Sequence, residues 1–285
     1  MIRDPFNGPS NLVNDELYRR YCVLIREKTG LHFNDSSRFY LEKRLENRMR
    51  DLQVESFEDY FNLIQYDPER EQEWARLIAT ITTNETYFMR EERQLRCFQR
   101  EILPALWRLN PGQTIRIWSA GCSSGEEPYT LAILIREGRA VPEEKVEIYA
   151  TDINERVLAK AKEGLYGPNS FRAVDDSFKA RWFRREGGGH YRLREEIRER
   201  VKFGRFNLFD IQRYSLLAPF NVVFCRNVII YFDLEAKVRV VERFHEKMKP
   251  GGFLLLGHSE SLISVTDKFK LVHLKSDLVY TREEP

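Results

Sequence analysis

The sequence has few cysteines, no long apolar run and almost no net charge. Its four cysteines, among 285 residues, are widely separated and form no Cys-x-x-Cys pair, so they predict neither a disulfide framework nor a zinc site. No apolar stretch approaches the roughly 20 residues of a membrane-spanning helix, and the first residues do not form a secretory signal. The formal net charge of +2 gives no overall reason to expect a nucleic-acid ligand. We therefore expect a cytoplasmic protein without a metal ion and without membrane insertion.

The central motif is a strand, a glycine-containing turn and a helix within residues 114–135. Residues 114–119 alternate and are rich in β-branched and aromatic side chains, which is typical of a strand. The turn contains Gly121 and Gly125, and residues 129–135 predict a buried helix with Pro128 in its first turn. In an open α/β sheet this arrangement forms a cofactor site, because the backbone and the N–H groups of the helix come close to the ligand.

The turn lacks the features of a phosphate-binding loop. It has no Gly-Lys-Ser/Thr and departs from Gly-x-Gly-x-x-Gly, and the carboxylates of Glu126 and Glu127 stand where a pyrophosphate would need a bare helix end. Asp152 follows the next strand, residues 146–150, where an acidic side chain can accept both hydroxyls of a ribose. Adenosine with a cationic amino-acid tail describes S-adenosylmethionine. The alternative is an ordinary core turn, with Asp152 capping the next helix.

The first 83 residues predict a small all-α domain, because their apolar side chains follow helical spacing in four successive stretches. The second of these helices carries a set of basic side chains, namely Arg38, Lys43, Arg44, Arg48 and Arg50. Acidic residues are interspersed among them, so one interpretation is a solvated face. The other is a docking surface for something acidic, either a nucleic acid or an acidic protein helix.

Residues 82–90, between this domain and the central strand, are rich in hydrogen-bonding side chains. Asn84 and Thr86 either cap the helix expected over residues 91–100 or form a polar lid over a ligand, and Arg90 is the one permanent cation of the segment.

The rest of the chain, residues 84–285, predicts an α/β domain with a doubly wound sheet. Its further strands are expected at residues 201–208, 220–225 and 253–256, with a closing antiparallel hairpin at residues 269–274 and 278–281.

The α/β rhythm is interrupted at about residues 171–203. Charged residues and a hairpin around residues 187–189 predict an inserted antiparallel β-subdomain, with a further strand over residues 197–203. Insertions of this kind often carry recognition.

Ligands of such a sheet bind at the carboxyl ends of its strands. The residues expected there are Gly121, Glu127, Asp152, Asn207, Arg226, Asn227 and Tyr231. The prolines of the Asn/Asp-Pro-Pro-aromatic motif, common in methyltransferases that act on base amines, are missing after Cys225, which disfavours base methylation. The sequence Gly-His-Ser-Glu-Ser at residues 257–261 resembles a nucleophile elbow only in part, because its last glycine is absent.

Residues 83–90, 118–129, 150–153, 224–232 and 257–261 together resemble the CheR family, the chemotaxis receptor glutamate methyltransferases. The resemblance covers almost the whole chain. It implies a Rossmann-like class I methyltransferase sheet with an antiparallel last strand, preceded by a small all-α domain and carrying an inserted β-subdomain. It also implies S-adenosylmethionine as methyl donor and γ-glutamyl methyl esters on receptor helices as products.

The resemblance implies roles for individual residues. Carried over position by position, it assigns cofactor binding to Asn84, Thr86, Arg90, Glu127, Asp152, Asn207, Leu208, Arg226 and Asn227, and it places Tyr231 near the transferred methyl group. Glu127 is favoured over Glu126. We expect Arg90, Arg226 and Tyr231 to orient the acceptor carboxylate, or one of the two arginines to hold the cofactor's own carboxylate.

Two surfaces are expected to bind the receptor. The helix with Lys43, Arg44, Arg48 and Arg50 is expected to contact acidic receptor helices by charge, and the inserted hairpin to accept a C-terminal receptor peptide by strand addition. Two other functions stay open: a methyltransferase that acts on RNA or a small molecule, and a non-catalytic protein that binds S-adenosylmethionine as a signal.

Overall fold

The computed structural model describes residues 13–283. The chain divides into two compact units, and the boundary falls between Thr83 and Asn84. Each unit has its own core and is described by itself.

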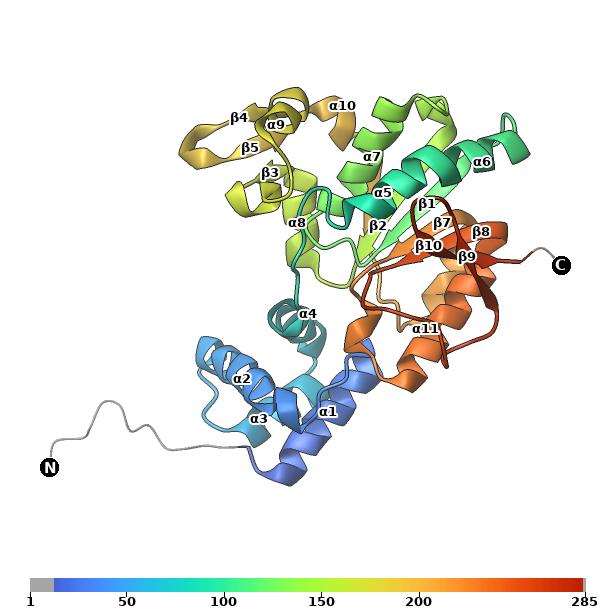
Figure 1. Ribbon diagram of the computed structural model, residues 1–285. Helices are drawn as coiled ribbons and strands as arrows, with labels where there is room; N and C mark the ends of the chain where they lie inside the picture. The colour runs from blue at the N-terminus through green and yellow to red at the C-terminus, as the bar shows by residue number, and fades with distance from the viewer. Residues whose placement is uncertain (1–12, 284–285) are drawn as a thin grey trace, which may run out of the picture. The chain divides into compact units, whose positions relative to one another are not determined.

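In its described part, residues 13–83, the first unit consists of four helices and a short 3-10 turn, which is the small all-α domain that the sequence predicts (Figure 1). The helices are α1 (Asp15–Thr29), α2 (Arg38–Leu52), α3 (Phe57–Tyr66) and α4 (Arg70–Ile81), with η1 (Asp35–Ser37) before α2. The N-cap side chain of α3, Ser56, accepts a hydrogen bond from the N–H of Asp59, and α1 ends at Gly30 in the left-handed conformation. Buried apolar side chains on the facing helices, among them Tyr21, Ile25, Leu41, Leu45 and Tyr60, fill the core.

Arg48 does not belong to an exposed basic face, which corrects one member of the predicted docking surface. Its guanidinium donates to Glu73 of α4 through Nε at 2.8 Å and through Nη2 at 2.7 Å, and to Asp51 at 2.6 Å. Tyr60 of α3 donates to the same Glu73 at 2.7 Å. The Arg48 side chain is only 9% exposed, so it joins α2 to α4 within the core.

The second unit contains a seven-stranded sheet of order β6-β2-β1-β7-β8-β10-β9. Its strands are β1 (Ile115–Ala120), β2 (Val146–Asp152), β6 (Val201–Arg205), β7 (Phe220–Cys225), β8 (Met248–Leu256), β9 (Phe269–His273) and β10 (Leu278–Arg282). The five strands from β6 to β8 pair in parallel, whereas β10 is antiparallel to both β8 and β9. The predicted Rossmann-like sheet with an antiparallel last strand is therefore confirmed.

Helices cover both faces of this sheet (Figure 1). One face carries α5 (Glu92–Cys97), the π-helical η2 (Phe98–Ile102), α6 (Leu103–Leu109), α7 (Glu126–Gly138) and α8 (Glu155–Glu163), and α11 (Leu234–Lys247) covers the other. The side chains of successive residues of β1 point to opposite faces of the sheet. Ile117 belongs to the core around α7, while Trp118 packs against Phe220 and Phe244 on the α11 side.

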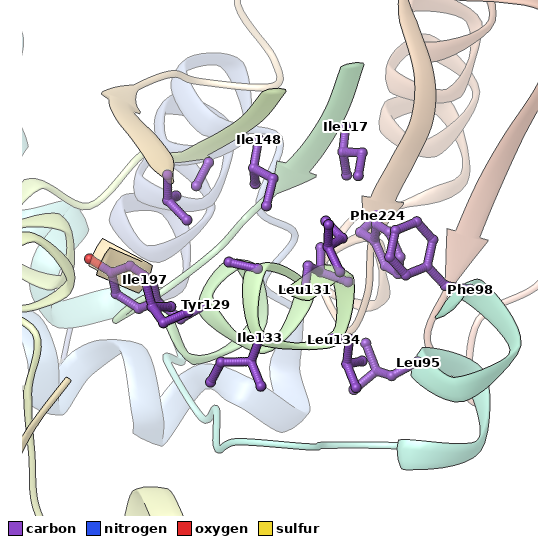
Figure 2. Packing of buried hydrophobic residues seen from close by; sticks show 14 of the residues in the cluster. Leu95, Phe98, Ile117, Tyr129, Leu131, Ile133, Leu134, Ile148, Ile197 and Phe224 are labelled. Atoms are coloured by element: carbon purple, nitrogen blue, oxygen red, sulfur yellow. The ribbon is translucent and has the colours of Figure 1, made fainter. Parts of the chain in front are cut away.

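The helix after the glycine turn is the most buried helix of the unit. Figure 2 shows Leu131 of α7 near Ile117 and Phe224 of the sheet, with Leu134 on the side of Leu95 in α5. The helix starts at Glu126, three residues before the apolar run, because Gly125 in the left-handed conformation serves as its N-cap. Both glutamates of the turn thus lie in the first helical turn, where negative charge is favourable.

The insertion forms a separate antiparallel sheet of order β3-β5-β4, next to α9 (Asp176–Trp182) in Figure 1. Its strands are β3 (Leu165–Tyr166), β4 (Phe183–Arg185) and β5 (Tyr191–Leu193). The strand expected over residues 197–203 is not formed as such. Residues Glu195–Arg198 make the helical turn α10, whose Ile197 enters the core, and β6 begins at Val201 and pairs with β2 of the main sheet.

Within residues 13–283, no helix is both long and apolar enough to cross a membrane. The same residues contain no group of three or more His, Cys, Asp or Glu side chains that could hold a metal ion.

Candidate functional site

The carboxyl ends of β1, β7 and β8 lie side by side in the sheet, so the turns that follow them come together. The loop after β7 packs on the glycine turn after β1. A Cβ atom at Gly121 would lie 2.4 Å from Cγ2 of Val228, so any other residue would clash there. The backbone of Gly121 also has a positive φ of 84°, which favours glycine. Gly121 thus lets the two loops approach closely. It has no side chain with which to contact a ligand.

Asp152 ends β2 and points its carboxylate back over the glycine turn. Oδ2 accepts the N–H of Ser123 at 2.8 Å and Oδ1 accepts the N–H of Asn154 at 2.9 Å. Burial raises the pKa of this carboxyl, and the main-chain N–H groups oppose that shift. The cap of the next helix, α8, is Asn154 and not Asp152, so the alternative that Asp152 merely caps that helix is wrong. A carboxylate has about four acceptor sites, so Asp152 can still accept a hydrogen bond from a further donor.

The two glutamates of the turn face different neighbours. Glu127 accepts the Ser119 hydroxyl at 2.7 Å, next to the end of β1, and lies 3.2 Å from Arg226 of the β7 loop. Glu126 accepts the hydroxyls of Ser124 and Ser170, both at 2.8 Å, and is almost fully buried. Glu127 therefore faces the strand ends, whereas Glu126 joins the turn to the start of the insertion.

Arg226 is held between two carboxylates. Besides Glu127, its guanidinium contacts Glu91 at 3.1 Å and donates to the main-chain oxygen of Arg90. Burial raises the pKa of Glu127 against the opposing effect of Arg226. Burial also raises the pKa of Glu91. Its interactions with Arg226, His258 and Asn227 outweigh this effect, so the pKa of Glu91 is lowered.

Glu91 is not among the residues predicted from the sequence. It could have been recognised from its position directly after Arg90, at the start of a helix that enters the strand-end region. Since its carboxylate also accepts the side-chain amide of Asn227 at 3.4 Å, it connects two of the predicted residues.

Residues 84–90 are fixed along the edge of this site. The main-chain oxygen of Asn84 accepts the hydroxyl of Ser123 at 3.1 Å, and the N–H of Phe88 donates to Ser170 at 2.9 Å. The Phe88 ring is fully buried in an aromatic cluster with Tyr166, Phe171, Phe178 and Phe183 of the insertion. The segment is thus anchored on both the glycine turn and the insertion.

Asn84 and Thr86 do not cap the helix after this segment. The N-cap of α5 is Glu91, in a left-handed conformation and without a side-chain capping bond. Of the two interpretations, capping is therefore wrong. Arg90, half-buried, donates to the main-chain oxygen of Glu85 and has its guanidinium 5.8 Å from the ring centroid of Tyr87.

The remaining predicted residues lie on the loops after β6 and β7. Asn207 accepts the N–H of Phe209 through its side-chain oxygen at 3.0 Å, and the oxygen of Leu208 accepts the Tyr214 hydroxyl at 2.9 Å. Asn227 has a left-handed backbone with φ of 58°. Tyr231 is 36% exposed.

A second carboxylate that the sequence analysis did not single out is Glu260. It accepts main-chain N–H groups from Asn227, Val228, Ile230 and Gly257 at distances of 2.7 to 3.2 Å. Glu260 belongs to the Gly-His-Ser-Glu-Ser motif, and this motif is the sequence feature from which it could have been recognised.

The chain resembles known methyltransferases over nearly its whole length. Residues 84–278 match the family model "CheR methyltransferase, SAM binding domain", and residues 16–82 match "CheR methyltransferase, all-alpha domain". Chemotaxis protein methyltransferase 2 of Vibrio cholerae is 36% identical over 94% of this chain and 93% of its own length. The chemotaxis protein methyltransferase of Salmonella typhimurium is 34% identical over 91% and 88%, and that of Escherichia coli is 33% identical over 91% and 89%.

Proposed function

Because this chain belongs to the CheR methyltransferase family, we propose that it transfers the methyl group of S-adenosylmethionine to glutamate side chains of chemoreceptor proteins. The products are γ-glutamyl methyl esters and S-adenosylhomocysteine. The observation that carries the proposal is a pair of carboxylates: Asp152 is buried at the end of β2, and Glu127 is largely buried in the first turn of α7, after the neighbouring strand β1.

The residues fit S-adenosylmethionine by their charge. When they are ionised, the carboxylates of Glu127 and Asp152 act only as acceptors, which suits an ammonium group and ribose hydroxyls. Glu91 and Glu127 both contact the buried guanidinium of Arg226, and Asp152 adds a third carboxylate at the neighbouring strand end. This excess of negative charge favours a cationic ligand over a dinucleotide.

We assign the cofactor-binding roles as follows. Asp152 accepts the ribose hydroxyls, Glu127 accepts the ammonium group, and Asn84, Thr86, Asn207, Leu208 and Asn227 line the remainder of the cofactor site, with Gly121 letting the loops close. Arg226 already has two carboxylate partners, so its contribution is to hold Glu127 and Glu91 in place. Arg90 is then the arginine with a guanidinium available for a carboxylate, either that of the cofactor or that of the acceptor.

The reaction needs no general base. A glutamate side chain has an ordinary pKa of about 4.3 and is already a carboxylate at neutral pH. S-adenosylmethionine supplies an activated methyl group on a sulfonium. The chain's own residues must bring the weakly nucleophilic carboxylate into line with that group and remove its water. We assign this orientation to Tyr231 and Arg90.

The acceptor is proposed to bind at two places. Lys43 and Arg50 are exposed on α2, and Arg44 is half-buried beside the ring of Tyr40, so these three remain as the basic surface for acidic receptor helices. Strand β4 lies at an edge of the inserted sheet, where a receptor C-terminal peptide could add as a further strand. Both roles place the protein in the cytoplasm.

Methyl-labelled S-adenosylmethionine tests the proposal directly. The purified chain is incubated with cytoplasmic fragments of candidate receptors and, in parallel, with total RNA. We expect label in the receptor that alkali releases as methanol, since esters hydrolyse and N-methyl groups do not. Alkali-stable label, label in RNA, or binding of the cofactor without any transfer would each contradict the proposal.

A further inference from the structure

The loop after β7 is held from both sides by the turns of its two neighbours in the sheet. On the β1 side, Val228 packs on Gly121. On the β8 side, a Cβ atom at Gly257 would lie 2.6 Å from Nδ2 and 2.9 Å from the main-chain nitrogen of Asn227. The loop therefore has little room to move toward either neighbour.

The carboxylate of Glu260 accepts hydrogen bonds from the main-chain N–H groups of this loop. Glu260 Oε2 accepts the N–H groups of Asn227 and Gly257, both at 2.7 Å. Oε1 accepts those of Val228 at 3.0 Å and Ile230 at 3.2 Å. Charge-assisted bonds of this kind are about twice as strong as neutral ones, and each of the four N–H groups would lose this partner if the carboxylate were absent.

The conformation held in this way is an uncommon one. Asn227 has a positive φ of 58°, its side-chain amide donates to Glu91 at 3.4 Å, and Tyr231 ends the 3-10 turn Ile229–Tyr231 that follows. Of the four bonds, one is made by Asn227 itself and two by Val228 and Ile230, which lie between Asn227 and Tyr231, the two residues that the proposed function uses.

We propose that Glu260 is a positioning residue of the methyltransferase site, which holds Asn227 and Tyr231 in their working places through the main chain of residues 227–230. It acts through that loop and contacts neither the cofactor nor the acceptor. The proposal rests on the proposed function for the roles of Asn227 and Tyr231.

Glu260→Gln is the main test. A glutamine keeps the length of the side chain but has one acceptor oxygen, so it can serve only one of the two pairs of N–H groups, and its NH₂ group faces the other pair. Glu260→Asp keeps both oxygens and the charge and is expected to recover part of the loss. The matched control is Glu101→Gln, because Glu101 also accepts two main-chain N–H groups, those of Lys275 and Ser276 at 2.7 and 3.0 Å, but in the turn between β9 and β10 and not in the loop after β7.

The measurements are the Kd of S-adenosylhomocysteine by calorimetry, the KM for S-adenosylmethionine with kcat, and amide hydrogen exchange on the full chain. In Glu260→Gln we expect binding of S-adenosylhomocysteine to weaken roughly tenfold, KM to rise, and the amides of residues 227, 228, 230 and 257 to lose protection. In Glu101→Gln we expect lower stability with an unchanged Kd. Gly257→Ala is the second variant, should Glu260→Gln fail to fold, and its methyl group is expected to displace Asn227 and weaken binding in the same way.

An unchanged Kd in folded Glu260→Gln, or an equal loss in Glu101→Gln, would overturn the positioning role. The exchange measurement keeps this result separate from the proposed function. If the wild-type chain methylates no receptor, the proposed function fails, whereas selective loss of protection at the four amides still supports Glu260 as the group that holds the loop. Uniform loss of protection over the whole sheet would contradict it.

Discussion

The guanidinium of Arg226 lies 3.2 Å from the carboxylate of Glu127, with both side chains largely buried at the ends of β1 and β7. Glu91 shares the same guanidinium at 3.1 Å. Removal of a buried ion's partner is costly, because the remaining charge is left without compensation. This relationship distinguishes Arg226, whose contribution is chiefly to hold the site together, from Arg90.

Arg226→Met is therefore expected to destabilise the protein by about 3–5 kcal/mol, the cost of breaking a buried pair. Arg90→Met is the matched control: its guanidinium is half-buried and hydrogen-bonds to a main-chain oxygen, so it is expected to cost about 1 kcal/mol or less. Urea denaturation of the two variants measures the difference. Equal losses would show that Arg226 is not the structural centre of the cluster.

The ribose assignment concerns Asp152. Asp152→Ala is expected to weaken S-adenosylmethionine and S-adenosylhomocysteine alike, by about 1.5–3 kcal/mol, because the same charge-assisted hydrogen bonds are made to both ligands. Asp175→Ala removes an exposed capping carboxylate of α9 and serves as a control of the same chemistry. Calorimetry decides the matter: unchanged affinity in folded Asp152→Ala would remove Asp152 from the site.

The pH dependence of binding follows from the raised pKa values of Glu127 and Asp152. Between the ordinary and the raised pKa, the folded protein holds more protons than the unfolded chain, so these groups make stability fall as the pH rises through that range. Affinity for S-adenosylmethionine is expected to change in the opposite direction and rise, because a cation binds the ionised carboxylates. Calorimetry from acid to neutral pH measures it, and Glu127→Gln should flatten the curve. A pH-independent Kd in the wild type would contradict ionised carboxylates as the binding groups.

Much of the second unit could be predicted because its pattern is local. Alternation marked β1, two glycines marked the turn, and the position of Asp152 after the next strand was enough to suggest a ribose. What could not be predicted depends on partners far apart in the chain. The contacts of Glu260 with residues 227–230 and of Glu91 with Arg226 join different loops, and no spacing in the sequence encodes them.

The same reason explains the errors. Arg48 looks like its exposed neighbours on α2, and only Glu73, a core carboxylate contributed by α4, shows that it points inward. Residues 197–203, which include the apolar Ile197, Val201 and Phe203, were interpreted as one strand. Ile197 instead lies in a helical turn, α10, and is buried there. Its apolar character predicts burial, but it does not distinguish a strand from a helical turn.

Tyr231 and Arg90 are expected to act on the rate. If they orient the acceptor, Tyr231→Phe and Arg90→Ala should lower kcat more than they weaken S-adenosylhomocysteine, because an interaction made chiefly in the transition state appears in the rate. Phe232→Leu, a buried substitution in the same loop, is the control for general disturbance. Receptor methylation by either variant at the wild-type rate would exclude it from catalysis.

The last prediction concerns the basic surface of α2, now reduced to Lys43, Arg44 and Arg50. Exposed charges act mainly on encounter and are screened over about 10 Å at 0.1 M salt. The double variant Lys43→Glu and Arg50→Glu is therefore expected to slow receptor methylation most at low salt and to leave the Kd of S-adenosylhomocysteine unchanged.

Arg48→Met separates this effect from folding. It leaves Glu73 buried without its partner, so it is expected to lower the stability of the first unit by about 3–5 kcal/mol, without the salt dependence of the double variant. A salt series of initial methylation rates, with thermal unfolding of each variant, distinguishes the two. If the charge-reversed protein matches the wild type at every salt concentration, these side chains form a solvated face, and the receptor must be recognised elsewhere.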